Sequence, residues 1–159
     1  MTSPLVSRST TVAVEQERAF DLFVGRLGDF KPPEHNLLAT PIAETVFEPW
    51  VGGSILDRSA DGSECRWGRV LAFDRPHRVV FSWNIGPTWQ LVSDPSHASE
   101  VEVRFVAEGV SSTRVHIEHR HLDRHGPGWE AVRAGVDDDA GWPLYLSRFS
   151  ALAQTSGAA

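Results

Sequence analysis

The sequence of 159 residues has one cysteine and one lysine, and its basic residues form no cluster. Because Cys65 has no partner for an internal disulfide or a cysteine-based zinc site, we expect it to be a small buried apolar residue. Apart from Lys31, the basic residues are arginines scattered among the acidic ones, and the formal net charge is -6. Binding to nucleic acid is therefore not expected, because neutralising phosphates requires a basic face.

Long apolar segments and several enzyme motifs are also missing. No apolar run approaches the ~20 residues of a membrane-spanning helix, and the N-terminal MTSPLVSRST lacks the apolar core of a signal peptide. We therefore expect a cytoplasmic protein that makes no membrane contact. Walker A, G-x-G-x-x-G and G-x-S-x-G motifs are absent, so nucleotide and hydrolase chemistry are not indicated and no cofactor is expected.

What is present indicates a single α+β domain over residues 1–159. Hydrophobic residues make up 41% of the chain and charged residues 23%, which is a globular composition. Alternation predicts a first strand within 5–14 and six more strands between 41 and 123, with turn residues between them. Helical spacing predicts a helix over 15–28 that ends at Gly28, at most a short second helix within 30–37, and C-terminal helical segments over 127–136 and 141–154. Pro143 fits the first turn of the last helix.

This element order predicts an antiparallel sheet of about seven strands, with one face packed on a long C-terminal helix. A curved sheet wrapped around a helix leaves space between them, and a binding site is expected there. Aromatic residues supply the inner face: strand alternation places Val79, Phe81, Trp83 and Ile85 on one side, where they can meet Trp142 and Phe149. Plain core packing is the simpler interpretation of any single one of these aromatic residues.

The segment HIEHRHLDRH, residues 116–125, contains four of the seven histidines. On a strand, His119 and His121 share the inner side with Val115 and Ile117, whereas His116 faces outward. If this strand forms a hairpin with the preceding one, Val101 lies opposite His119 and Val103 opposite Ile117. That register needs a loop of odd length, which Gly109-Val110-Ser111 supplies. The outward face is then a charge ladder that needs no functional explanation: Glu102, Arg104, Arg114, His116, Glu118 and Arg120.

The two inward histidines have three interpretations. Zinc would need a third protein ligand, and the other inward candidates are apolar, so no metal site is predicted. A histidine that hydrogen-bonds a neighbour or a polar group of a ligand is favoured. General acid or base catalysis by His119 or His121 remains open, although no partner carboxylate is indicated beside them.

Several segments resemble the SRPBCC superfamily, the Bet v 1-like or START-like helix-grip proteins, and within it the bacterial branch related to the activator of heat-shock-protein-90 ATPase. The segments are PPEHNL, IAETVFEPWVGGSI, DGSECRWGRVLAFDRPHRVVFSW, SEVEVRFVAEG, TRVHIEHRHLDRHG and GWPLYLSRF, within residues 5–153. The resemblance implies a seven-stranded sheet that grips the C-terminal helix around an apolar cavity. It implies no catalytic motif. Relatives often carry two tryptophans where this chain has Phe30 and Lys31, so the resemblance does not fix the cavity mouth.

The first hypothesis for function is a protein that binds a small, mostly apolar or amphipathic ligand in this cavity. An enzyme of the cyclase type that uses an inward histidine is the second, and no catalytic residue is assigned. The third is a protein-interaction module, which stimulates a chaperone ATPase or forms a homodimer through a strand edge. The cavity candidates are Trp67, Phe81, Trp83, Phe105, Ile117, His119, His121, Trp142 and Phe149.

Overall fold

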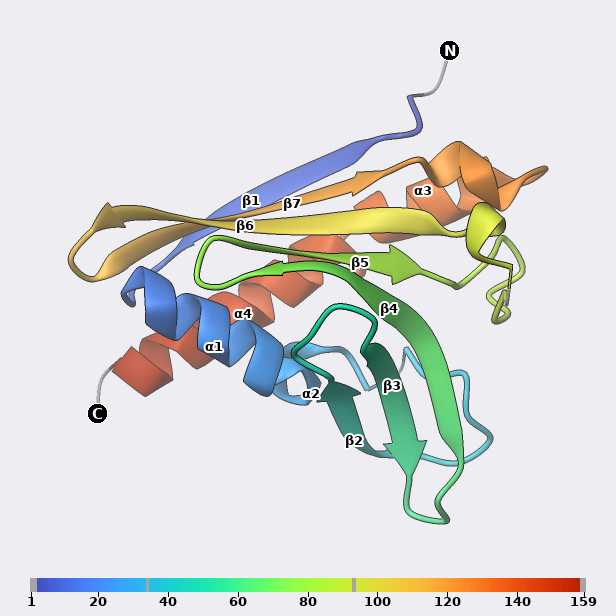
Figure 1. Ribbon diagram of the computed structural model, residues 1–159, viewed down its shortest axis with the longest axis horizontal. Coiled ribbons are helices and arrows are strands. Elements are labelled where there is room, and N and C mark those ends of the chain that lie inside the picture. Colours follow the sequence, from blue (N-terminus) through green and yellow to red (C-terminus); the bar gives the residue numbers. More distant parts are fainter. Residues whose placement is uncertain (1–2, 34, 93, 158–159) are drawn as a thin grey trace.

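Seven antiparallel strands form one curved sheet in the computed structural model, which describes residues 3–33, 35–92 and 94–157 (Figure 1). The strand order is β1-β7-β6-β5-β4-β3-β2, so only β1 lies out of chain order, beside β7. This confirms the predicted helix-grip architecture. The strands are β1 (Val6–Val12), β2 (Ile42–Phe47), β3 (Ser54–Ser59), β4 (Glu64–Asp74), β5 (Arg78–Trp83), β6 (Ser99–Gly109) and β7 (Ser112–Arg120).

The helices lie on one side of this sheet, with the long α4 along its concave face (Figure 1). Pro143 is the second residue of α4, as predicted. Two short 3-10 helices flank the hairpin of β6 and β7, with η1 before β6 and η2 after β7. The elements are α1 (Gln16–Gly25), α2 (Leu27–Phe30), α3 (Trp129–Asp137), α4 (Trp142–Gly157), η1 (Pro95–His97) and η2 (Leu122–His125).

The two N-terminal helices differ from the prediction in their bounds. Helix α1 ends at Gly25 rather than Gly28, because Arg26 leaves the helical conformation with φ -130 and ψ 31. Gly28 instead lies within α2, where a Cβ would meet the Thr45 Cβ at 3.3 Å. The second helix was predicted within 30–37 but is already complete at Phe30. Residues 31–33 and 35–37 are not helical, and Glu34 lies outside the described residues.

The core lies between α1, α4 and the inner face of the sheet. Phe149 of α4 is fully buried, with its ring centroid 5.4 Å from that of Phe23 and 4.9 Å from that of Phe30. Phe105 of β6 packs against Phe20 and Phe23 of α1, at 5.2 and 5.7 Å. These edge-to-face contacts join the helices to the sheet.

The register of β6 and β7 is the predicted one, but the turn between them is not. Val101 pairs with His119 and Val103 with Ile117. The last pair is Gly109 with Ser112, which leaves a two-residue turn instead of three. A register shift between Ala107 and Gly109 makes up the difference, because a β-bulge adds one residue to one strand.

Strand β4 bends where the sheet curls, and this bend positions the tryptophans of the inner face. Register shifts interrupt its pairing with both neighbours, near Ile55 on β3 and near Val70 on β4 itself. Gly68 lies at this point, and a Cβ there would be 2.8 Å from the carbonyl oxygen of Ser82. Only glycine allows β4 and β5 to approach so closely.

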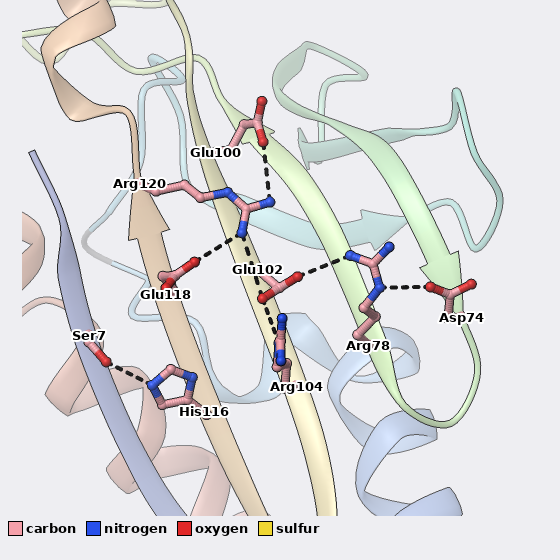
Figure 2. Close-up of polar contacts among 9 residues, drawn as sticks. All are labelled: Ser7, Asp74, Arg78, Glu100, Glu102, Arg104, His116, Glu118 and Arg120. Atoms are coloured by element: carbon pink, nitrogen blue, oxygen red, sulfur yellow. Dashed lines mark hydrogen bonds and ion pairs between the residues drawn. The ribbon is translucent and has the colours of Figure 1, made fainter.

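The outer face of the sheet carries the predicted charge ladder (Figure 2). Its centre, Glu102, is only 4% exposed, because arginine side chains cover it. Arg104 donates to its carboxylate at 2.6 Å and Arg78 at 3.0 Å, and Arg120 lies 3.6 Å away. Burial raises the pKa of Glu102, but the hydrogen bonds and charges of these arginines outweigh it and lower the pKa. The ladder is therefore a connected ion network centred on one buried carboxylate.

We expect Phe149→Ala to lower the free energy of unfolding by about 3–5 kcal/mol, the usual cost of removing a buried phenylalanine ring. Urea unfolding followed by circular dichroism measures this change. Ser147→Ala, at an exposed position of the same helix, should change stability by no more than about 0.5 kcal/mol. A loss below about 1 kcal/mol for Phe149→Ala would show that α4 is not held by this aromatic cluster.

Candidate functional site

A pocket of about 590 Å³ opens between the sheet, α3 and α4. Buried tryptophans from three elements form its wall: Trp67 of β4, Trp83 of β5 and Trp142 of α4. Their rings meet edge to face, with centroids 5.5 Å apart for Trp67 and Trp83 and 5.4 Å apart for Trp83 and Trp142. The residues around the pocket are Lys31, His35, Asn36, Leu37, Asp57, Trp67, Trp83, Ile85, Trp89, Ala134, Gly135, Val136, Asp138, Ala140, Gly141, Trp142 and Tyr145.

Two of these tryptophans carry buried N–H groups for which no described residue is a hydrogen-bond acceptor. The indole nitrogens of Trp67 and Trp83 have no hydrogen-bond partner among the residues that the structure describes. A buried donor without a partner lowers stability, so phenylalanine would be the less costly residue for packing alone. Within the described residues, these two indole rings therefore contribute size and shape to the wall rather than a hydrogen bond.

The polar end of the pocket is a buried ion pair. The Lys31 ammonium lies 3.1 Å from the Asp57 carboxylate, and the two side chains are only 5% and 3% exposed. The same ammonium donates to the carbonyl oxygen of His35, and Thr45 donates its hydroxyl to Asp57 at 2.7 Å. Lys31 also lies 5.9 Å from the centre of the Trp67 ring, within the range of a cation–π contact. An apolar wall thus ends in a matched pair of opposite charges.

Beside the ion pair, a histidine and a tyrosine form a second polar group. The Nδ1 atom of His35 and the hydroxyl oxygen of Tyr145 are 3.2 Å apart, within hydrogen-bond distance. His35 is half-buried, and Tyr145 lies on α4 one turn after Trp142. An imidazole next to a phenol is an arrangement that can pass a proton to or from a bound molecule.

Behind the tryptophan wall, hydrogen bonds connect Trp142 to two histidines through a serine. The indole N–H of Trp142 donates to Nδ1 of fully buried His119 at 3.1 Å. Because that nitrogen accepts, the proton of neutral His119 is on Nε2, which donates to the Ser99 hydroxyl at 2.7 Å. Ser99 in turn donates to Nε2 of His125 at 2.7 Å. The proton of His125 then resides on Nδ1, which has no partner among the described residues.

Burial controls the protonation of both histidines. Desolvation, followed by the nearby His125, lowers the pKa of His119 to about 3. Desolvation also lowers the pKa of His125, and His97 adds to the effect. Both imidazoles are therefore neutral near pH 7, and His119 serves as an acceptor that fixes the orientation of Trp142.

At the mouth of the pocket, Trp89 rests on helix α3. Its backbone has φ 58, a left-handed conformation that is uncommon for a bulky residue. A Cβ at Gly135 would be 2.5 Å from the Trp89 ring, so α3 can receive this ring only because residue 135 is glycine. Trp89 lies in a loop whose ends are joined by the β-bridge between Ile85 and Leu91. The Asn84 side chain also donates to the Val92 carbonyl oxygen at 3.1 Å. Trp89 therefore narrows the entrance while remaining half exposed.

The family model described as activator of Hsp90 ATPase homolog 1-like protein matches residues 30–154. The chain belongs to this family. No curated protein matches the chain.

Several solved structures are similar to this AHSA1-like chain over almost their whole length. One is the anthrahydroquino-γ-pyrone synthase Txn09, solved as a complex, with 40% identity, TM-score 0.66, and coverage of 93% of this chain and 96% of its own. Another is the self-sacrificing resistance protein CalC of Micromonospora echinospora, with 30% identity, TM-score 0.71, and coverage of 97% and 96%. A Mesorhizobium loti protein with 16% identity and TM-score 0.68 covers 96% of this chain and 98% of its own, and shows the fold alone. Together with the family, the first two support a ligand-binding domain of the helix-grip type.

The nine residues proposed from the sequence have four different placements in this AHSA1-like structure. Trp67, Trp83 and Trp142 surround the pocket. Phe81, Phe105, Ile117 and Phe149 are buried in the core and do not line it, and His119 lies behind Trp142. The inward placement of His121 was wrong. Strand β7 ends at Arg120, and His121 has a left-handed backbone and an exposed side chain.

Sequence reasoning missed the polar residues of the pocket and its entrance: Lys31, His35, Asp57, Trp89 and Tyr145. One signal was available, because Lys31 is the only lysine of the chain. The others carried no signal, since strand and helix periodicity do not say which polar side chains meet across the fold. In the described ranges, no three potential metal ligands come together. No described helix is long and apolar enough to cross a membrane.

We predict that stability falls as the pH drops from about 6.5 toward 3, because unfolded histidine binds a proton in this range and buried His119 does not. One such group contributes a slope of up to about 1.4 kcal/mol per pH unit. The contribution of His119 is complete above pH 6.5 and is lost on acidification. Urea unfolding at several pH values should show a shallower slope for His119→Phe than for the unmodified chain. Equal slopes would contradict the burial of a neutral imidazole.

Proposed function

We propose that this chain binds a planar, polycyclic aromatic small molecule in the tryptophan-walled pocket. The observation that carries the proposal is the convergence of Trp67, Trp83 and Trp142, from three different elements, on one cavity of about 590 Å³. That volume lies in the range of small-molecule sites, roughly 300–1,000 Å³. A wall of flat rings that alternate in orientation favours a flat, apolar ligand.

Two further features support a ligand of this kind. Trp89 supplies a fourth indole at the entrance, positioned to cover a bound molecule. The 40% identical relative is named as a synthase whose product combines an anthrahydroquinone with a γ-pyrone. Fused aromatic rings of that type match the shape that the tryptophan wall favours. The polar end at Lys31 and Asp57 then faces one edge of the ligand.

We expect 9,10-anthraquinone to quench the intrinsic tryptophan fluorescence of this chain in a saturable manner. Ala134→Trp places a bulky ring at the pocket and should weaken binding by about tenfold or more, as overpacking does. Fluorescence titration and calorimetry measure both affinities. Ala131→Trp is the matched control, because Ala131 is an exposed alanine of the same helix that does not line the pocket. Equal weakening by the two variants, or no saturable binding, would refute the pocket assignment.

A second function is favoured by the His35–Tyr145 pair, namely ring closure on the bound molecule. In this reaction a ligand hydroxyl adds to a carbonyl carbon of the same molecule. His35 takes the hydroxyl proton while Tyr145 donates a proton to the carbonyl oxygen, and transfer between the two restores them. Loss of the new hydroxyl with a neighbouring C–H proton, as water, completes a ring of the pyrone type. No oxidant or reductant is needed, and proton transfer of this kind contributes about 10²–10⁴-fold in rate.

Tyr145→Phe removes the phenol proton and keeps the ring, so it should lower the rate of ring closure by about 10²-fold or more while leaving affinity within about threefold. The substrate is an anthraquinone with an open 1,3-diketone side chain beside a phenol, and mass spectrometry follows the loss of one water. Thr155→Val, at an exposed hydroxyl on the same helix, is the control. Unchanged turnover in Tyr145→Phe, or no turnover in the unmodified chain, would leave only the binding function.

A further inference from the structure

The Lys31–Asp57 ion pair has hydrogen-bonding positions that no described residue fills. An ammonium has three N–H donors, and the described contacts account for two of them, to Asp57 and to the His35 carbonyl oxygen. A carboxylate has about four lone-pair positions, and Asp57 receives one hydrogen bond from Thr45 and one contact from Lys31. Both side chains line the pocket, so a donor and an acceptor are side by side at its end.

Stability alone is a weak explanation for an ion pair at this position. Removing two charges from water is costly, and a well-packed apolar pair is often as stable as a buried ion pair. Trp67 also lines the pocket, and its ring centre is 5.9 Å from the Lys31 ammonium. A buried pair of charges at the end of an aromatic pocket is, however, well suited to orient a ligand, because a few polar groups set specificity in a mostly apolar site.

We propose that Lys31 and Asp57 recognise adjacent hydroxyl and carbonyl oxygens on one edge of the aromatic ligand. Lys31 donates to the carbonyl oxygen, and the hydroxyl donates to Asp57. The ligand class is therefore a hydroxyquinone, or an aromatic ketone with an enolised β-dicarbonyl group, rather than a plain hydrocarbon. The inference rests on the proposed binding function and adds to it the chemistry of one ligand edge. Lys31 and Asp57 act as binding residues, not as members of the proton-transfer pair.

Two probes of the same three-ring shape test this recognition: anthracene, which has no oxygen, and 1-hydroxyanthraquinone, which has a hydroxyl beside a carbonyl. We expect the unmodified chain to bind the hydroxyanthraquinone about 10- to 100-fold more tightly, the range for one or two hydrogen bonds to charged groups. In Lys31→Met/Asp57→Asn, which removes both charges together, the preference should fall to within about threefold. Anthracene affinity should stay within about threefold of that of the unmodified chain, which shows that the pocket is retained.

The matched control is Arg26→Met/Asp29→Asn. It removes an ion pair of 2.6 Å from the same stretch of chain, where both side chains are about half exposed and neither lines this pocket. The control should keep the full preference for the hydroxyanthraquinone. Equal loss of preference in the two double variants would overturn the assignment, because it would trace the effect to general charge or folding.

A measurement that needs no substitution is available because Lys31 is the only lysine. Labelling with ¹⁵N,¹³C-lysine gives one side-chain ammonium signal, and 1-hydroxyanthraquinone should shift it far more than anthracene does. If both probes bind equally and the lysine signal responds to neither selectively, the recognition is refuted while the binding function stands. If neither probe binds, the binding function fails and the inference falls with it.

Discussion

The contact of Trp142 with the inner face of the sheet is the interaction on which the site depends. This residue starts α4, packs edge to face on Trp83 of β5 and donates its N–H to His119 of β7. One side chain therefore fixes where the helix begins, where it meets the sheet and what the pocket wall presents. Gly141 makes this start possible, since a Cβ there would lie 2.3 Å from the Val136 carbonyl oxygen. The tight α3–α4 turn and the wall are thus one structural unit.

The buried polar groups differ in how many of their hydrogen-bonding positions other described residues fill. His119 is fully used: one nitrogen accepts from Trp142, the other contacts Ser99, and burial keeps the ring neutral. Glu102 on the outer face is also saturated, by three arginines. Lys31 and Asp57 line the pocket and have hydrogen-bonding positions that no described residue fills. This difference, rather than burial alone, separates structural polar groups from those available to a ligand.

Sequence reasoning succeeded where a single strand or helix decides the outcome. Alternation placed His119 inward, and matching apolar faces fixed its pairing with Val101. It failed for His121, two residues on, because the strand ends at Arg120 and a left-handed backbone turns the side chain out. The ends of strands depend on local backbone conformation, which residue types predict poorly. Lys31 shows the other limit: its burial depends on Asp57, which is distant in sequence and meets it only through the tertiary fold.

Membership in the AHSA1-like family leaves the activity open, because one fold carries many functions and the site decides among them. Here three features surround one cavity: an aromatic wall, the Lys31–Asp57 ion pair with hydrogen-bonding positions that no described residue fills, and the His35–Tyr145 pair. Binding needs only the first two, whereas ring closure needs the third as well. In a carrier, the hydrogen bond between His35 and Tyr145, 3.2 Å long, would contribute only to structure. Binding is therefore the property that both functions share, and the imidazole–phenol pair is the feature that separates them.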